Sequence, residues 1–231
     1  MAIEFKIFQK FPQLKFGLSQ KLDGPMELAG SGEFAYREMF FAKNHININQ
    51  TVGAKLAHSE NVVLVGVKDR GTVIQNVDGL VTKDADVVLT ITVADCYPIY
   101  FFAPNENAIG LAHSGWRGSV GTLIENTIKE IKTDPASLFV GIGPGIGLCH
   151  FEIRNDTIEK FKDFPNAVKY RGKKIFIDLP KVINHQLIKA GVKPKNIEFI
   201  GECTYCEPNK YFSYRSDKPA KIQAMVAYIG L

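Results

Sequence analysis

The stretch DVVLTITVADC, residues 86–96, decides the fold class, because its first eight residues are apolar or β-branched almost throughout. Such a run predicts a largely buried strand of ordinary length. The strand would deliver the thiol of Cys96 at its C-terminal end. A second apolar run, AIGLA over residues 108–112, leads in the same way to the imidazole of His113. Two strand ends therefore carry metal-ligating side chains, and together they indicate a site.

The residues after His113 extend this pattern from a strand into a helix. A Gly-Trp-Arg-Gly turn over residues 115–118 precedes helical apolar spacing over residues 119–132. His113 and Arg117 are therefore expected in a strand-to-helix turn, where functional side chains are common.

Segments with strand and helix periodicity alternate along the chain without an internal repeat. We expect one α+β domain over residues 1–231, a layered α/β sandwich with mixed sheets, because hairpins and helical crossovers both occur. Strands are predicted over residues 3–8, 14–19, 62–67, 72–77, 86–93, 98–102, 108–112, 138–142 and 225–229, a hairpin over 167–177, and helices over 33–44, 119–132, 155–161 and 179–190.

Composition limits the possible classes of protein. The 231 residues carry a formal net charge of only +4, with 45% hydrophobic and 23% charged residues, which is ordinary for a globular protein. Lys and Arg are scattered, so nucleic acid is not an expected partner. No apolar run approaches the roughly 18 residues of a membrane span, and the first residues lack a signal-peptide core. A cytoplasmic location with reduced cysteines is therefore expected.

Five motifs in order resemble one known family. They are ADCYP (94–98), AHSGWRG (112–118), IGPGIG (142–147), CT (203–204) and FSYR (212–215). This set resembles the laccase-domain family, also called YfiH-like and long labelled multicopper polyphenol oxidase. The resemblance implies a single layered sandwich of helices and sheets. It also implies a zinc-dependent enzyme that phosphorolyses adenosine, inosine or methylthioadenosine, with some members deaminating adenosine, so that the expected partners are a purine nucleoside and phosphate.

The resemblance assigns two of the three family metal ligands to Cys96 and His113. Zinc suits a thiolate and imidazoles, and a catalytic zinc keeps a fourth position open. Asp95, beside the thiol, is a candidate ligand orienter or proton carrier. Arg117 is our own candidate for phosphate, because a guanidinium donates bidentately.

The third ligand is not evident from the sequence. The family places a histidine shortly before an Asp-Gly-Leu-Val-Thr segment, yet residues 66–72 contain none, and Arg70 or Asp69 occupies the expected position. Arginine has no lone pair to offer a metal, whereas Asp69 could supply an oxygen. His45, His58 and His185 fall in polar helical or loop contexts, and no role is predicted for them.

A second departure from the family concerns the remaining cysteines. Cys149-His150 stands where the family commonly has paired cysteines. The spacing of Cys203 and Cys206 is metal-like but has no second pair, so a half zinc knuckle is not predicted. These departures suggest a divergent member. The main expectation is thus a zinc-dependent purine nucleoside phosphorylase; the alternatives are a catalytically degenerate, metal-free binding protein and, last, a copper-dependent phenol oxidase.

Overall fold

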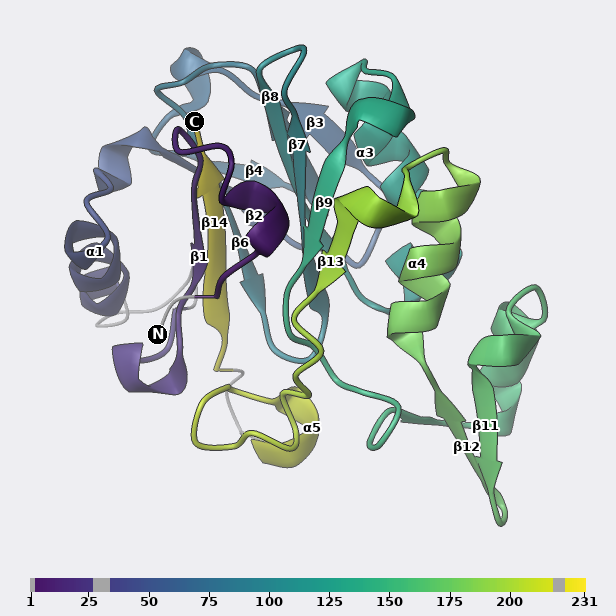
Figure 1. Cartoon of the computed structure of the whole chain (residues 1–231). Coiled ribbons are helices and arrows are strands. Elements are labelled where there is room, and N and C mark those ends of the chain that lie inside the picture. Colours follow the sequence, from purple (N-terminus) through teal and green to yellow (C-terminus); the bar gives the residue numbers. More distant parts are fainter. Residues whose placement is uncertain (1–2, 27–33, 218–222) are drawn as a thin grey trace.

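We describe the protein from a computed structural model over residues 3–26, 34–217 and 223–231 (Figure 1). Two large mixed sheets organise it. The five-stranded sheet has the order β1 (Lys15–Leu18), β14 (Met225–Gly230), β6 (Val88–Val93), β2 (Thr51–Lys55), β4 (Val73–Gln75). The six-stranded sheet has the order β13 (Ile197–Phe199), β9 (Phe139–Ile142), β7 (Tyr97–Ala103), β8 (Ala108–Ser114), β5 (Gly79–Thr82), β3 (Val62–Leu64).

One of the two large cores lies between the two sheets, and strand alternation explains it. Every residue of β7 is buried. Because successive side chains of a strand point to opposite faces, Tyr100 and Phe102 enter the core shared with β6, while Ile99 and Phe101 face the helices. A continuous apolar run is thus the expected signature of a strand covered on both sides.

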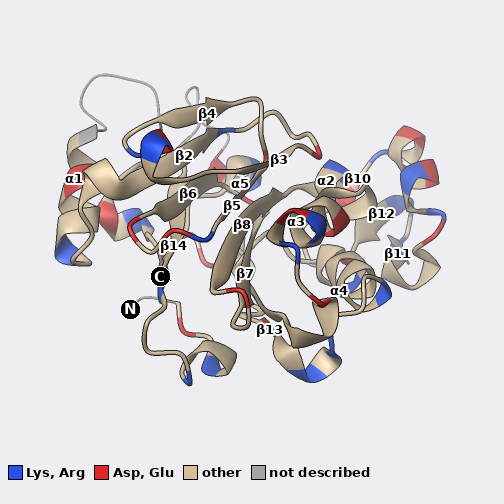
Figure 2. Ribbon diagram, turned by 90° about the horizontal axis from the view of Figure 1, so that it is seen from above, with Lys and Arg blue, Asp and Glu red and all other residues tan. Residues whose placement is uncertain are grey.

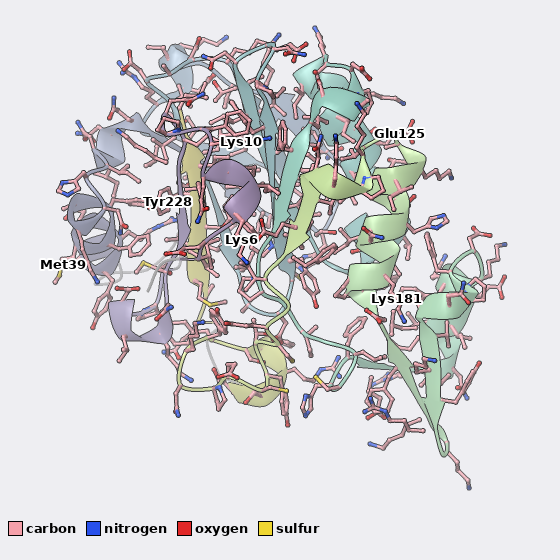
Figure 3. The ribbon with its side chains drawn as sticks, viewed as in Figure 1. Lys6, Lys10, Met39, Glu125, Lys181 and Tyr228 are labelled. Carbon is pink, nitrogen blue, oxygen red and sulfur yellow. The ribbon has the colours of Figure 1, made fainter. Side chains whose placement is uncertain are left out.

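Helices cover the outer faces of both sheets. The amphipathic helix α3 (Leu123–Ile131) and α4 (Leu179–Lys189) pack on the six-stranded sheet through one apolar cluster. On the five-stranded sheet, α1 (Phe34–Lys43) contributes Phe40 and Phe41, which meet Tyr228 edge to face. Tyr228 extends from β14 toward α1, whereas Met39 lies on the outer side of that helix (Figure 3). The layers therefore run helix, sheet, sheet, helices.

A small sheet projects beside α4. It has the order β10 (Glu152–Ile153), β12 (Lys174–Ile177), β11 (Val168–Arg171), and β11 and β12 form the predicted hairpin. Charged residues of both signs fall mainly in loops and helices, while the strands carry few of them (Figure 2). Among the described residues, the helices lack the length and apolar character needed to cross a membrane.

The sequence-based elements need several corrections. Residues 6–8 form a 3-10 turn instead of part of a strand, and 155–161 form a 3-10 helix. The expected helix over 119–132 is two helices, α2 (Trp116–Val120) and α3, separated at Gly121, whose backbone is extended. The strands β2, β5, β10 and β13 were not predicted. Glu33, the predicted first residue of α1, lies outside the described residues.

Candidate metal centre and its cavity

Cys96 sits in the tight turn between β6 and β7. The residue before it, Asp95, has a left-handed backbone with φ of +82°, a conformation that aspartate tolerates better than most residues. This turn moves the chain from the five-stranded to the six-stranded sheet, because β6 belongs to one and β7 to the other. The thiol is thereby placed at the edge of the space between the two sheets.

His113 reaches the same place from the neighbouring strand. In the β7–β8 hairpin, Pro98 lies opposite His113 and Tyr97 opposite Ser114. The strand β8, which carries His113, therefore lies beside β7, which begins just after Cys96. His113 is buried. The predicted pairing of thiol and imidazole is therefore a consequence of one antiparallel hairpin.

His58 supplies a third donor that the sequence analysis did not assign. It lies in the loop after β2, with a left-handed φ of +53°, and it is exposed. One ligand atom each from His58, Cys96 and His113 lie within 4.8 Å of one another, and the rings of His58 and His113 meet edge to face at 5.0 Å between centroids. The interpretation that this chain lacks a third donor is therefore wrong.

The two residues proposed in its place are engaged elsewhere. Asp69 accepts a hydrogen bond from the Gly66 amide at 2.9 Å and so caps a 3-10 turn. Arg70 is exposed just after that turn. Neither residue lines the cavity at Cys96.

Asp78 holds both histidines in place from a fully buried position. One carboxylate oxygen accepts the Nδ1 hydrogen of His113 at 2.9 Å and the backbone N–H of His58 at 3.1 Å. The other accepts from the backbone N–H of Ser59 at 2.7 Å and its hydroxyl at 2.8 Å. Because Nδ1 of His113 is occupied, Nε2 is the nitrogen left for a metal, an arrangement in which a carboxylate orients a ligating histidine.

The charges at this centre support one another. Burial acts to raise the pKa of the Cys96 thiol, but the charge and hydrogen bond of His113, followed by those of His58, outweigh burial and lower it. Burial acts to lower the pKa of His113, but Cys96 and then Asp78 raise it. The metal-free centre therefore favours a thiolate beside an imidazolium, and a cation that displaces the imidazolium proton would keep the charge of the thiolate and of Asp78 balanced.

The centre opens into a cavity of about 620 Å³. Apolar and aromatic side chains make much of its wall, among them Trp116, Ile146, Phe151, Leu179 and Tyr214. Lys55 and Arg215 also line it. A mainly apolar cleft with a few converging polar groups is the usual form of a small-molecule site.

Asp95 and Arg117 have different surroundings from those expected. The Asp95 carboxylate accepts from the Thr204 hydroxyl at 2.6 Å and from the Arg215 backbone N–H at 2.7 Å, so it fastens the 203–215 segment to the Cys96 turn. Its role as a proton carrier remains a prediction. Arg117 is exposed, and its guanidinium stacks over Trp116 at 4.6 Å. Arg215 lines the cavity, and the expected role of Arg117 toward phosphate stays a prediction.

Gly115 leaves the room that the three donors need. A Cβ added there would lie 3.0 Å from the Cys96 sulfur and 3.4 Å from Cδ2 of His58. We expect Gly115→Ala to weaken metal binding about tenfold by displacing these ligands. Competition with a chelator would measure this. Gly118→Ala is the control, since the three atoms nearest to its Cβ would all belong to the core residue Leu123 and to none of the three donors, and equal affinities in the two variants would contradict the prediction.

The donor set fits a catalytic metal ion. One thiolate and two imidazoles are ligands that zinc accepts, and three protein ligands facing a cavity leave a coordination position for substrate. His113 also has the carboxylate partner typical of such centres. The fold and site thus define a layered α+β protein with a cavity-facing Cys-His-His centre.

Comparison with known proteins shows the family. Residues 35–231 match the family described as multi-copper polyphenol oxidoreductase laccase, and the chain belongs to this family. It is 30% identical, over 96% of its own length and 94% of the relative's, to a purine nucleoside phosphorylase of Staphylococcus epidermidis. It is 34% identical to the purine nucleoside phosphorylase YlmD of Geobacillus stearothermophilus over 71% of this chain and 64% of that relative.

Solved structures confirm the fold. The crystal structure of YlmD from Geobacillus stearothermophilus superimposes with a TM-score of 0.90 at 28% identity, covering 96% of this chain and 93% of that one. YfiH from Bacillus licheniformis gives a TM-score of 0.89 at 25% identity, covering 96% and 94%. The predicted family and the layered fold with mixed sheets are both confirmed.

Proposed function

We propose that the protein is a zinc-dependent phosphorylase of purine nucleosides. The observation that carries this proposal is the convergence of His58, Cys96 and His113 at the wall of a cavity large enough for a nucleoside. The names of the relatives from Staphylococcus epidermidis and Geobacillus stearothermophilus support the same substrate class. His58, Cys96 and His113 would hold the ion, with Asp78 orienting both histidines.

Zinc fits the centre better than copper. Dioxygen reduction by a multi-copper oxidase requires a cluster of histidine-rich copper sites, whereas this chain has five histidines in all. A single copper site for electron transfer adds a weak axial ligand such as methionine, and the described cavity lining contains none. An open position toward a cavity is instead the mark of a catalytic zinc site.

Different residues of the cavity would serve different steps of phosphorolysis. When bound, zinc would supply Lewis-acid polarisation of an oxygen atom. The aromatic rings of Trp116, Phe151 and Tyr214 offer surfaces for a purine base. Arg215 and Lys55 offer positive charge for phosphate, whose oxygen attacks the anomeric carbon of the ribose. The glycosidic C–N bond breaks with its electron pair going to the base, so the products are ribose 1-phosphate and a purine that takes up a proton.

The alternative of a metal-free, degenerate binding protein was based on the missing third ligand. His58 removes this basis, because three donors are present and the buried Asp78 carboxylate holds two of them, His58 and His113. A deaminase activity on adenosine would use the same cavity and is best treated as an outcome of the assay.

We expect protein purified without added metal to contain bound zinc and to release free base from inosine, adenosine or methylthioadenosine only when phosphate is present. Replacing phosphate by sulfate, a similar anion that is a poor nucleophile, should abolish release. Chromatography separates adenine from inosine, so phosphorolysis and deamination are read independently. Zinc-loaded protein that releases no base from any of the three nucleosides would refute the proposal.

The same assay can test the anion site with a pair of arginine variants. Arg215→Lys should raise KM for phosphate about tenfold, because a lysine loses the bidentate geometry of the guanidinium. Arg117→Lys is the matched control, since Arg117 stacks on Trp116 outside the cavity lining. An unchanged KM for phosphate in Arg215→Lys and a raised KM in Arg117→Lys would show that Arg117 is the residue that binds phosphate.

A further inference from the structure

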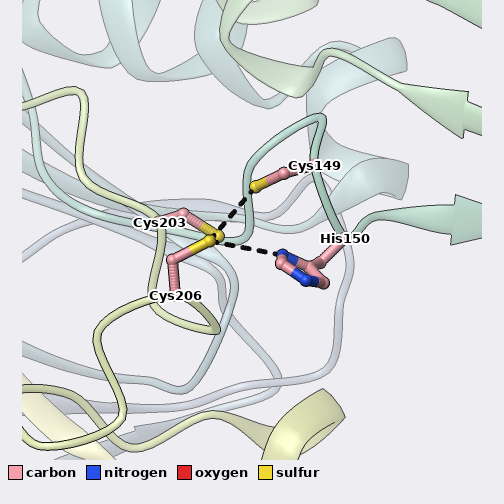
Figure 4. Close-up of side chains that lie close together, drawn as sticks. All are labelled: Cys149, His150, Cys203 and Cys206. Atoms are coloured by element: carbon pink, nitrogen blue, oxygen red, sulfur yellow. Dashed lines mark hydrogen bonds between the residues drawn. The ribbon is translucent and has the colours of Figure 1, made fainter.

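A second group of metal-ligating side chains lies outside the cavity, where two distant loops meet. Cys149 and His150 come from the loop before β10, and Cys203 and Cys206 come from the loop after β13 (Figure 4). One ligand atom of each lies within 4.8 Å of all the others. From this geometry we propose that these four residues bind a second, structural zinc ion.

The distances suit tetrahedral coordination. The sulfurs of Cys149 and Cys206 are 3.5 Å apart, and the Cys206 sulfur lies 3.3 Å from Nδ1 of His150. Zinc–sulfur bonds of about 2.3 Å and zinc–nitrogen bonds of about 2.0 Å place neighbouring ligands roughly 3.5–3.8 Å apart around a tetrahedron. Three thiols and one imidazole form a complete structural set, which leaves no open position.

The backbone already holds the ligands as a metal knuckle would. The Gly147 amide donates to the Cys203 sulfur at 3.2 Å, a bond that stabilises a thiolate. The Cys206 amide donates to the Cys203 carbonyl at 3.0 Å and closes the turn between these two cysteines. The ring of His150 stacks on Tyr205 at 3.8 Å between centroids, and this contact fixes the imidazole.

A disulfide is the competing explanation, and the arrangement disfavours it. A bond between Cys149 and Cys206 would use two sulfurs and would leave the third thiol and the imidazole without a reason to converge. Cys149 and Cys206 are both exposed, so packing does not force them together either. A shared ligand accounts for all four positions at once.

The ion would clamp two loops that build one wall of the cavity. Gly145 and Cys203 form a parallel bridge, and Thr204 joins the Asp95 carboxylate beside Cys96. The Arg215 guanidinium donates to the Glu152 carbonyl at 3.2 Å, next to Phe151 of the cavity wall. The second ion would therefore hold Arg215 and Phe151 in position without touching substrate.

Metal content of reciprocal variants tests this proposal apart from the catalytic one. Wild-type protein should contain about two zinc ions per chain, while Cys96→Ala and the Cys203→Ser/Cys206→Ser double variant should each contain about one. In Cys96→Ala, X-ray absorption should show three sulfurs and one nitrogen around the remaining ion. A single ion that disappears with Cys96→Ala would overturn the second site and leave the proposed function intact.

Cobalt and thiol labelling provide readouts that do not depend on the folding of the double variant. Wild type and Cys96→Ala loaded with Co²⁺ should both show strong thiolate-to-metal absorption, and Cys206→Ser should weaken it. Cys149 and Cys206 should resist alkylation until a chelator is added, and chelation should lower Tm by about 5 °C or more. Rapid labelling of the metal-treated protein, or a Cys149–Cys206 disulfide in protein purified under reducing conditions, would contradict the proposal.

Discussion

Replacing His58 by alanine should lower the affinity of the catalytic centre for zinc by about 100-fold or more and reduce kcat/KM at least as much. The reason is that His58 contributes one of only three donors, and two ligands facing an open cavity hold zinc weakly. Competition with a chromophoric chelator gives the affinity, and phosphorolysis at limiting zinc gives the activity. The expected activity loss should be partly reversed at high zinc concentration.

His45 offers a closely matched control. It is also an exposed histidine with a left-handed backbone, φ +57°, but it does not line the cavity. His45→Ala therefore carries the same cost of about 1–2 kcal/mol for placing alanine in this conformation, without removing a ligand. Equal zinc affinity in His58→Ala and wild type would show that Cys96 and His113 suffice and that His58 is not a ligand.

The sequence predicted the Cys96–His113 pair because each residue comes at the end of an apolar run. These runs, β6 and β8, lie in different sheets, and the β7–β8 hairpin brings the two side chains together. His58 was not predicted as a ligand, because the family resemblance places the histidine near residues 66–72 and His58 lies earlier in the chain. The short strand β2 was not recognised, so nothing indicated that the loop after it returns to Asp78, twenty residues further along. A histidine in a polar loop is predicted to be an ordinary surface residue, because the sequence does not show that Asp78 binds its backbone N–H.

The second cluster was missed for the same physical reason at longer range. Cys203 and Cys206 have metal-like spacing, but their partners lie more than fifty residues earlier in the chain. The parallel bridge between Gly145 and Cys203 and the pairing of β13 with β9 bring the two loops together. Periodicity predicts which residues form strands, whereas it does not predict which strands become neighbours across such separations.

Asp78→Asn should destabilise the metal-free protein by about 2–4 kcal/mol and weaken zinc binding 10- to 100-fold. An amide cannot accept from His113, His58 and Ser59 together, because one of its two polar atoms is a donor. The β5–β8 pairing holds Gly79 opposite Ala112, so the Asn side chain would still face His113 and would present the wrong group. Denaturant midpoints with chelator present measure the first effect, and chelator competition measures the second.

The pH dependence of the stability lost in Asp78→Asn tests whether the carboxylate is its cause. Burial acts to raise the pKa of Asp78, but hydrogen bonds from His113 and Ser59 outweigh it and lower the pKa from 3.8 to about 2. A carboxylate with a depressed pKa stabilises the folded state above its unfolded value and loses that contribution as the pH falls. The stability difference between wild type and Asp78→Asn should therefore be largest near about pH 5 to 6 and should shrink between about pH 4 and 2 as Asp78 is protonated. It should also shrink as the pH rises toward about 9, because Asp78 helps to raise the pKa of His113 and this contribution is lost when His113 loses its proton.

Asp69→Asn is the control for both effects, because Asp69 caps one exposed turn through the Gly66 amide. It should cost less than about 1 kcal/mol and leave zinc affinity unchanged. If Asp69→Asn lowered zinc affinity while Asp78→Asn did not, the carboxylate of Asp69 would be the group that serves the metal. The structure predicts the opposite. Within the described part of the chain, Asp78 is the one buried carboxylate that contacts two of the three donor residues.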